Sequence, residues 1–233
     1  MNWQEIQVSE DGTHFIYQGK PIFGKKFLEV LKFHAPGLAP VKDASGAYHI
    51  DSQGNALYPE RYTRTFGFYC YRAAVVQGLE WFHINEKGKR VYAHSFAWTG
   101  NFQENFCTVR DFENHYFHID LNGNRIYPDN YRYSGDFKDG YACVKLQNGL
   151  FTHIDTKGKF LHGKFFQDLG VFHKGFATAK DENGWFHIDK QGKELYAERY
   201  LSLEPFYNGF ALATNFDGEK VIIDETGKII IRT

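Results

Sequence analysis

The sequence contains few cysteines and no excess of charge of either sign. Only three of its 233 residues are Cys, and 27 Lys and Arg residues stand against 28 Asp and Glu, for a net charge of −1. A sparse, odd number of cysteines argues against a disulfide framework and predicts a reducing, cytoplasmic setting. Without a basic excess or a polybasic block, we expect neither nucleic acid nor a membrane as the partner.

The sequence also lacks long apolar segments and the common short motifs of enzymes. No stretch approaches the roughly 20 apolar residues that span a bilayer, and the N-terminus lacks the pattern of a secretory signal. There is no phosphate-binding glycine loop, zinc-type cysteine pairing or nucleophile elbow. Cys107 and Cys143 stand where sister segments carry Ala or Thr, so they are interpreted as small buried residues. We therefore expect no cofactor, no metal and no catalytic residues.

Aromatic residues and glycines, in contrast, are abundant. Phe, Tyr and Trp make up 18% of the chain, and there are 23 Gly. Aromatic side chains favour half-buried pleated surfaces, and glycines favour tight turns. The composition therefore predicts an all-β protein with many short connections.

The main feature of the sequence is a sevenfold internal repeat of about 35 residues. A His-Ile pair recurs at steps of 34 or 35 residues, and turn glycines recur in the same register. The anchor residues are His14, His49, His83, His118, His153, His187 and Ile222. The repeats run approximately over 1–27, 28–62, 63–96, 97–131, 132–165, 166–200 and 201–233, and we expect them to form one domain over 1–233.

Each repeat is expected to form three antiparallel strands. In the last one, "GFALATN", "KVIID" and "IIIRT" are separated by the short turns "FDGE" and "ETGK", which only antiparallel neighbours permit. In internal repeats the third strand is short, as in "ALY" at 56–58 and "ELY" at 194–196. The link that follows, such as "YPERYTRTFGF" at 58–68, can be a short helix, a fourth strand or irregular.

Repeats of this size cannot bury their aromatic face alone, so they must stack on their neighbours. The atypical first and last repeats resemble caps, which favours an open, twisted, solenoid-like stack. The alternative is a closed seven-bladed β-propeller, which hides its strand edges by radial repetition.

A His-x-Asp pair recurs in the repeats and has two interpretations. Strand alternation places Phe and Ile on one face and His and Asp on the other. A ladder of His49, His118, His153 and His187 with the following aspartates could bind metal or catalyse a reaction. We favour a structural interpretation, in which Asp closes the turn ahead of it and His donates to a carbonyl of the neighbouring repeat.

The repeat resembles the WG repeat of bacterial proteins. The shared pattern is carried by Phe137, Gly140, Ala142 and Val144, then Ile154, Asp155, Gly158 and Lys159, and again by Phe172, Gly175, Ala177, Trp185, Ile188, Asp189 and Gly192. The family's Trp-Gly pair is Trp-Phe here, at Trp185 and at Trp81, and the next aromatic is His, which indicates a divergent subgroup. The resemblance implies β-hairpin repeats in a binding or scaffold role, with no catalytic residues.

The links supply the candidate binding residues. Aromatic residues recur at what the spacing presents as one position, and basic residues lie beside them. These candidates are Tyr62, Phe96, Tyr131, Phe165 and Tyr200, with Arg61, Arg132 and Arg199. We expect a non-enzymatic module that engages a protein partner. Alternatively, exposed rings in a row could stack on carbohydrate, or the rings could be packing between repeats.

Overall fold

The computed structural model describes residues 1–232 and shows an all-β chain. Within this range the helical content is a single 3₁₀ turn, η1 (Trp3–Glu5), capped by the side chain of Asn2, which accepts from the amide of Gln4. No helix in the described residues is long and apolar enough to cross a membrane.

The strands form seven separate antiparallel sheets in tandem, and none closes into a barrel. Six sheets have three strands and the last has four, and within every sheet the strands are ordered as they follow in the chain. The sheets are β1 (Gln7–Val8), β2 (Phe15–Tyr17), β3 (Lys20–Pro21); β4 (Glu29–Val30), β5 (Ala39–Asp43), β6 (Gly46–Ile50); β7 (Arg64–Tyr69), β8 (Arg72–Gln77), β9 (Glu80–Ile84); β10 (Trp98–Thr99), β11 (Phe106–Arg110), β12 (Tyr116–Asp120); β13 (Tyr133–Ser134), β14 (Tyr141–Lys145), β15 (Phe151–Asp155); β16 (Asp168–Leu169), β17 (Phe176–Asp181), β18 (Gly184–Asp189); and β19 (Ser202–Leu203), β20 (Phe210–Thr214), β21 (Lys220–Asp224), β22 (Ile229–Arg232). Each sheet falls within one of the seven ranges given by the repeat.

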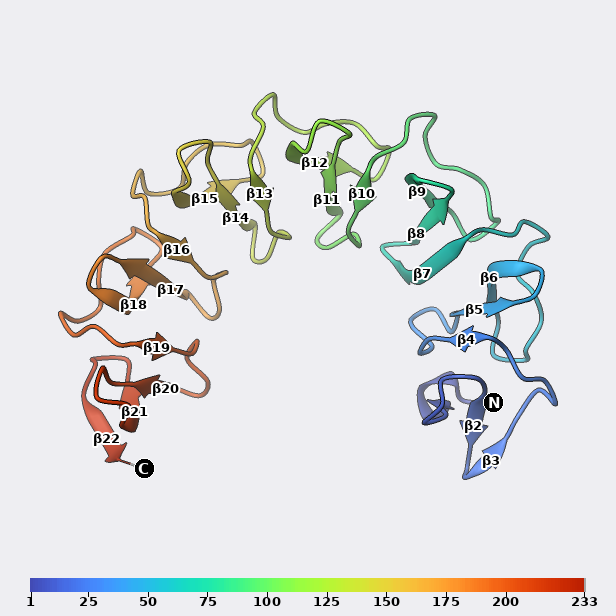
Figure 1. Ribbon diagram of the computed structural model, residues 1–233, viewed down its shortest axis with the longest axis horizontal. Helices are drawn as coiled ribbons and strands as arrows, with labels where there is room; N and C mark the ends of the chain where they lie inside the picture. The colour runs from blue at the N-terminus through green and yellow to red at the C-terminus, as the bar shows by residue number, and fades with distance from the viewer. Residues whose placement is uncertain (233) are drawn as a thin grey trace. The chain divides into compact units, whose positions relative to one another are not determined.

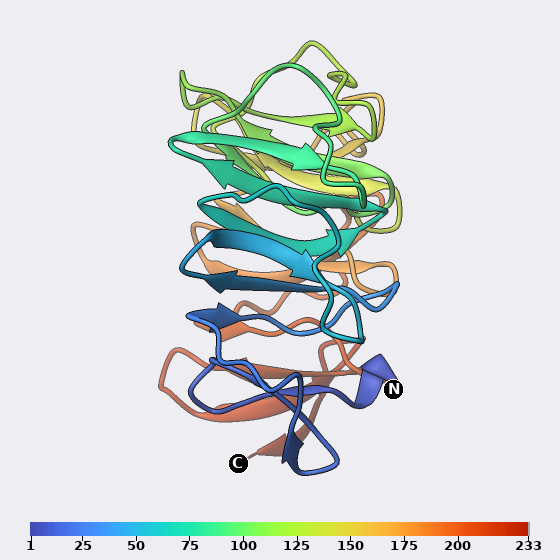
Figure 2. The same ribbon diagram turned by 90° about the vertical axis from the view of Figure 1, so that its right-hand side faces the viewer.

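The sheets group into two compact units. The N-terminal unit comprises Met1–Asn114 with His118–Arg125, and the C-terminal unit comprises His115–Phe117 with the chain from Ile126 onward. Within each unit, consecutive sheets follow one another in chain order (Figure 1). In the N-terminal unit, the sheet β4–β6 and the sheet β7–β9 lie one above the other (Figure 2). The choice between an open stack and a closed ring stays a prediction, as does the single domain.

The third strand of each internal repeat differs from the expectation. The segment 56–58 is reduced to one bridge, Ile50 to Ala56, and the segment 194–196 to one bridge, Ile188 to Glu194. The third strand comes instead from the end of the preceding link, as in β4 and β16. At the two ends of the chain a strand does follow the hairpin: the two-residue β3 in the first repeat, and in the last repeat β22, whose three consecutive isoleucines favour extended backbone.

The links between sheets are irregular. From the second sheet onward, each link is tied back to the sheet before it by an isolated antiparallel bridge, as between Ala47 and Tyr62 or between Trp185 and Tyr200. In each pair, the amide of either residue donates to the carbonyl of the other. For Ala47 and Tyr62 the two N···O distances are 2.8 and 2.9 Å. The link therefore forms neither a helix nor a full fourth strand.

Both faces of the internal hairpins are buried, so strand alternation does not separate a buried face from an exposed one. In β18, the consecutive residues Phe186, His187 and Ile188 are all buried, at 2%, 0% and 0% exposure. The same run of three buried residues recurs in β12 and β15. Because neighbouring sheets stack on one another, an internal sheet is covered on both faces, and alternation no longer marks the solvent side.

The aspartates that follow the His-Ile pairs close the turns, as predicted. The carboxylate of Asp189 accepts hydrogen bonds from the amides of Gln191 and Lys193, each at 2.9 Å. Asp51, Asp120, Asp155 and Asp224 make the same two bonds. A carboxylate that satisfies two turn amides has a structural function.

Candidate functional site

The buried histidines join each repeat to the next. Nε2 of His49 lies 2.7 Å from the carbonyl oxygen of Phe66, in the first strand of the next sheet, and Nδ1 contacts the hydroxyl of Tyr58. The imidazole also packs on the ring of Phe68, with centroids 4.6 Å apart. A carbonyl can only accept, so Nε2 carries the proton, and the tyrosine hydroxyl must donate to Nδ1. The prediction that His donates to a neighbouring repeat is confirmed.

The arrangement recurs with the same sequence offsets. His83 contacts Tyr92 and the carbonyl of Gly100, His187 contacts Tyr196 and the carbonyl of Glu204, and His153 contacts the carbonyl of Gly170. In the fifth repeat, His162 replaces the tyrosine and lies 3.1 Å from Nδ1 of His153. Nδ1 of His162 accepts from the amide of Lys164, so its Nε2 is the donor.

Burial holds these imidazoles in the neutral form. Desolvation lowers the pKa of His49, His83, His153 and His187 to about 4, against an ordinary value of 6.5. Both ring nitrogens of each are occupied, so none is available as a metal ligand. In the described part of the chain, no group of three His, Cys, Asp or Glu side chains could hold a metal ion. His118, the remaining candidate ligand, is also fully buried.

The cysteines are placed as expected for core residues. Cys107 and Cys143 are buried, and Sγ of Cys143 lies 3.2 Å from the carbonyl oxygen of Leu169. Burial raises the pKa of the Cys143 thiol to about 12, which disfavours the nucleophilic thiolate.

Removing the tyrosine hydroxyl isolates the contribution of one histidine contact. Tyr58→Phe leaves Nδ1 of His49 as a buried acceptor without a donor, so we expect the free energy of unfolding to fall by about 1–3 kcal/mol. Urea denaturation followed by circular dichroism measures this change. Tyr71→Phe, at a 67% exposed position, is the control and should change it little. Equal stability of both variants would contradict the assigned hydrogen bond.

The link aromatics proposed for binding are packed inside. Phe96, Tyr131 and Tyr200 are 3–4% exposed, and Tyr62 is half-buried with its hydroxyl bonded to the carbonyl of Gly88. Phe165 is exposed, but it is not equivalent to the others, because the bridge to its sheet is made by Phe166. These rings form the packing between repeats and offer no row of stacking surface for a sugar.

The arginines of the links are also engaged within the fold. The guanidinium of Arg61 lies 3.8 Å from the ring centroid of Tyr48, and that of Arg199 lies 3.7 Å from that of Phe186. Arg199 also pairs with Asp181 at 2.8 Å and Glu194 at 3.0 Å. Arg132 occupies a different position from these two, since it follows the bridging Tyr131 whereas Arg61 precedes Tyr62.

Two equivalent grooves lie where one sheet meets the first strand of the next. We call them the N-terminal and C-terminal grooves. Glu29, Leu31, Pro40, Val41, Lys42 and Ala47 line the N-terminal groove, with Arg64 and Thr65 from the next repeat. Arg132, Tyr133, Lys145 and Phe151 line the C-terminal groove, with Asp168 and Leu169 from the next repeat.

Strand register shows that the grooves are the same place in two repeats. In the N-terminal groove, Lys42 faces Glu29 on one side and Ala47 on the other. In the C-terminal groove, Lys145 faces Tyr133 and Phe151 in the same way. Residues opposite one another across antiparallel strands point to the same face of a sheet. The three facing residues of each groove therefore lie side by side on one face of their sheet.

The C-terminal groove combines cationic and aromatic side chains. Nζ of Lys145 lies 4.8 Å from the ring centroid of Phe151, and in the following repeat Nζ of Lys180 lies 5.7 Å from the ring centroid of Trp185. Strand register places Asp168, which lines the groove, opposite Lys180, but among the described residues neither lysine forms an ion pair within 4.0 Å. Tyr133, which lies opposite Lys145 in the strand register, is 46% exposed. The arrangement can bind a carboxylate next to a flat apolar surface.

Sequence reasoning missed these grooves, although a signal for them exists. A basic residue occupies the position of Lys42 in four repeats, as Lys42, Arg110, Lys145 and Lys180, whereas the third repeat has Val76 there. An aromatic residue follows five or six positions later in all four, as Tyr48, Tyr116, Phe151 and Trp185. The repeat analysis concentrated on the His-Ile pair and did not follow this column.

Comparisons with known proteins show the fold. No protein-family model matches the sequence, and no curated protein matches it. Among solved structures, the computationally designed Ika8 protein aligns with a TM-score of 0.55 at 12% identity, over 98% of this chain and 83% of that one. BamB from Moraxella catarrhalis aligns with a TM-score of 0.54 at 14% identity, over 100% and 86%. KlHsv2 with loop 6CD replaced by a Gly-Ser linker gives 0.53 at 7%, over 98% and 97%. At these identities the likeness concerns the arrangement of the β-repeats alone.

Proposed function

We propose that this chain is a non-enzymatic binding module of WG-like repeats, in which the grooves between repeats hold an acidic segment of a protein partner. The observation that carries the proposal is the pair of lysines at equivalent positions, Lys145 and Lys180. Each holds its ammonium over its own aromatic ring and lacks a carboxylate partner among the described residues. A partner carboxylate would complete both sites.

The physical setting supports a protein ligand. Aromatic residues are enriched in protein interfaces, and stacked repeats present extended surfaces. The positive charge of these lysines is confined to a small part of the surface, since the whole chain is close to neutral. That balance favours a short acidic segment over a polyanion such as nucleic acid. The buried histidines and the Cys143 thiol described above make their hydrogen bonds within the fold.

The test uses a short fluorescein-labelled peptide of alternating Glu and Tyr, with a Lys-Tyr peptide for comparison. Fluorescence polarisation should show binding of the acidic peptide, weakened by salt because the contacts are exposed. The double variant Lys145→Glu/Lys180→Glu should weaken it about tenfold or more, since two exposed ion pairs are lost and replaced by repulsion.

A matched double variant controls for net charge. Lys157→Glu/Lys193→Glu makes the same charge change at two exposed turn positions outside the groove, and it should alter affinity less than about twofold. The proposed function would be contradicted if both double variants weakened binding equally. It would also be contradicted if the Lys-Tyr peptide bound as tightly as the Glu-Tyr peptide.

A further inference from the structure

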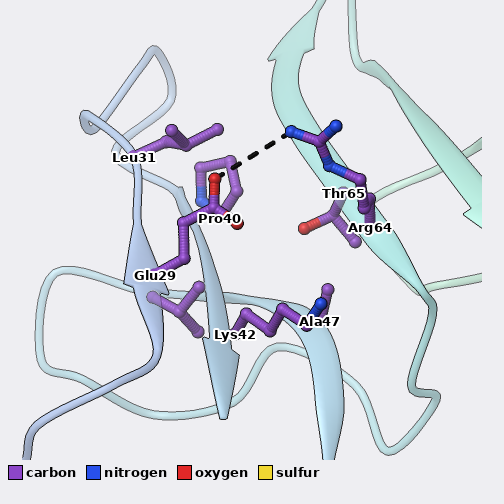
Figure 3. Close-up of a pocket in the computed structure, with 8 residues that line it drawn as sticks. Glu29, Leu31, Pro40, Lys42, Ala47, Arg64 and Thr65 are labelled. Carbon is purple, nitrogen blue, oxygen red and sulfur yellow. Dashed lines mark ion pairs between the residues drawn. The ribbon is translucent and has the colours of Figure 1, made fainter. Parts of the chain in front are cut away.

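The N-terminal groove is closed by side chains of the protein itself. Figure 3 shows the guanidinium of Arg64 reaching from β7 toward the carboxylate of Glu29 on β4. Nη2 of Arg64 lies 4.0 Å from Oε1 of Glu29, and the space left in the groove is about 10 Å³, which is room for about one water. A partner side chain that is to be buried must therefore find its place elsewhere.

The C-terminal groove has different residues at the two closing positions. Where the N-terminal groove has Glu29 and Arg64, it has Tyr133 and Asp168, each the first residue of its strand. Tyr133 and Asp168 form no ion pair across the groove, and the space there is about 540 Å³. Tyr133 is 46% exposed, and Asp168 is half-buried. This groove therefore has room for a large side chain of a partner.

Charges of both signs line the C-terminal groove. Arg132 and Lys145 line it, and Lys180 lies opposite Asp168 in the strand register. Among the described residues, none of these three cations forms an ion pair. Oδ1 of Asp168 accepts from the amide of Leu169 at 2.8 Å, whereas Oδ2 has no hydrogen-bond donor within the described part of the chain. The groove thus offers cations to carboxylates and a free acceptor to a donor.

A tyrosine side chain fits both the exposed ring and the free acceptor. The ring of Tyr133 favours an aromatic guest, since aromatic rings attract one another in offset or edge-to-face arrangements. Asp168 repels a carboxylate, so the group that meets it must be a donor. The three cations nearby disfavour a guest ammonium or guanidinium, which leaves a neutral donor such as a hydroxyl. Tyrosine carries ring and hydroxyl together.

We propose that the C-terminal groove accepts a tyrosine side chain from the acidic segment of the protein partner, with its ring against Tyr133 and its hydroxyl donating to Asp168. Arg132 and Lys145 bind carboxylates that flank this tyrosine. The inference rests on the proposed function and adds to it the residue that the partner must carry.

The test compares the labelled Glu-Tyr peptide with two analogues, in which Phe or O-methyltyrosine replaces every Tyr. Both analogues keep the charges and the rings, and both lack the O–H donor. Fluorescence polarisation should show that the native protein binds the Glu-Tyr peptide about fivefold more tightly than either analogue, since one hydrogen bond contributes about that factor.

Removing the acceptor should abolish this preference. In Asp168→Ala, the Glu-Tyr and Glu-Phe peptides should bind equally, and the Glu-Phe peptide should bind about twofold more tightly than to the native protein, because a repelling charge is gone. A variant that merely damages the fold would weaken both peptides. Glu225→Ala removes the same charge at an exposed turn outside the groove and is the matched control, which should retain the preference. Should Asp168→Ala fail to fold, the O-methyltyrosine peptide decides on the native protein.

The outcomes separate the inference from the proposed function. Equal binding of the Glu-Tyr peptide and its analogues to the native protein overturns the tyrosine site while acidic binding stands, as does a preference that persists in Asp168→Ala. If no acidic peptide binds, or Lys145→Glu/Lys180→Glu has no effect, the proposed function itself fails.

Discussion

Acidification from about pH 7 to about pH 4 is expected to unfold the protein, because buried neutral histidines must then take up protons. The pKa of His49, His83, His153 and His187 is lowered to about 4 in the folded state, against 6.5 ordinarily. Between these values the unfolded chain binds more protons than the folded one. The stabilisation is therefore complete above about pH 6.5 and is lost as the pH falls toward 4.

The size of the effect is comparable with the stability of a whole domain. One pKa unit corresponds to about 1.4 kcal/mol, so each of these four histidines costs on the order of 3 kcal/mol at about pH 4. Together they approach the roughly 5–15 kcal/mol by which folded domains are stable. Carboxylates with a lowered pKa, such as Asp11 at about 2, lose their contribution only at still lower pH. The transition near pH 5 should thus belong to the histidines.

The measurement is urea denaturation across this pH range, followed by near-ultraviolet circular dichroism. His187→Gln removes one of the titrating imidazoles, so the loss of unfolding free energy between pH 7 and the acid limit should become smaller than in the native protein. His94→Gln alters an exposed histidine and should leave that loss unchanged. An unfolding midpoint that stays constant between pH 7 and 4 would contradict the neutral, buried state assigned to these rings.

The histidine contacts show which parts of the fold the sequence could predict. The spacing of the histidines predicts that they recur at equivalent places, and their carbonyl contacts follow from stacking. The donors to Nδ1 also stand at a fixed offset of nine residues, as Tyr58, Tyr92, Tyr196 and His162. Whether these residues reach Nδ1 of the histidine depends on how the irregular link folds back on its own sheet. Periodicity alone does not specify this.

The candidate site was harder to predict, for two physical reasons. The spacing of the repeat placed Phe165 with Tyr62 and Tyr200, whereas backbone pairing selects Phe166. A shift of one residue moves a side chain to the other face, so this error exchanges a buried ring for an exposed one. The groove at Ala47 depends on what the next repeat presents, here Arg64 and Thr65, and no single repeat contains that information.

The positions that are identical in every internal repeat differ in place from a position that varies between repeats. Every internal repeat keeps the residues that join it to its neighbours: the buried His-Ile pair and the turn glycine. The position that begins the first strand varies freely, as Glu29, Arg64, Trp98, Tyr133, Asp168 and Ser202. This is the position that lines the grooves. The residues that line the two grooves therefore include a position that differs from repeat to repeat.

Gly88→Ala is expected to destabilise the fold much more than Gly78→Ala, although both glycines have positive φ, +70° and +64°. A methyl group at Gly88 would lie 2.5 Å from Cγ of Tyr58, in the preceding repeat, whereas nothing lies within 4 Å of one at Gly78. The backbone strain of about 1–2 kcal/mol is common to both. Gly88→Ala must in addition displace a buried ring whose hydroxyl donates to His49, so its total cost should be about 3 kcal/mol or more.

Chemical denaturation of the two single variants measures this difference, and a third variant identifies its cause. If the clash with Tyr58 is responsible, Gly88→Ala in a Tyr58→Ala background should cost little more than Gly78→Ala costs in the native protein, because the ring is gone. Additive effects of Gly88→Ala and Tyr58→Ala would show that the two residues do not interact. The same contact recurs between Gly123 and Tyr92, between Gly158 and Tyr127, and between Gly227 and Tyr196. A large cost at Gly88 therefore indicates that the aromatic ring of each link requires a glycine in the turn of the next repeat, which explains why these two residue types recur in register.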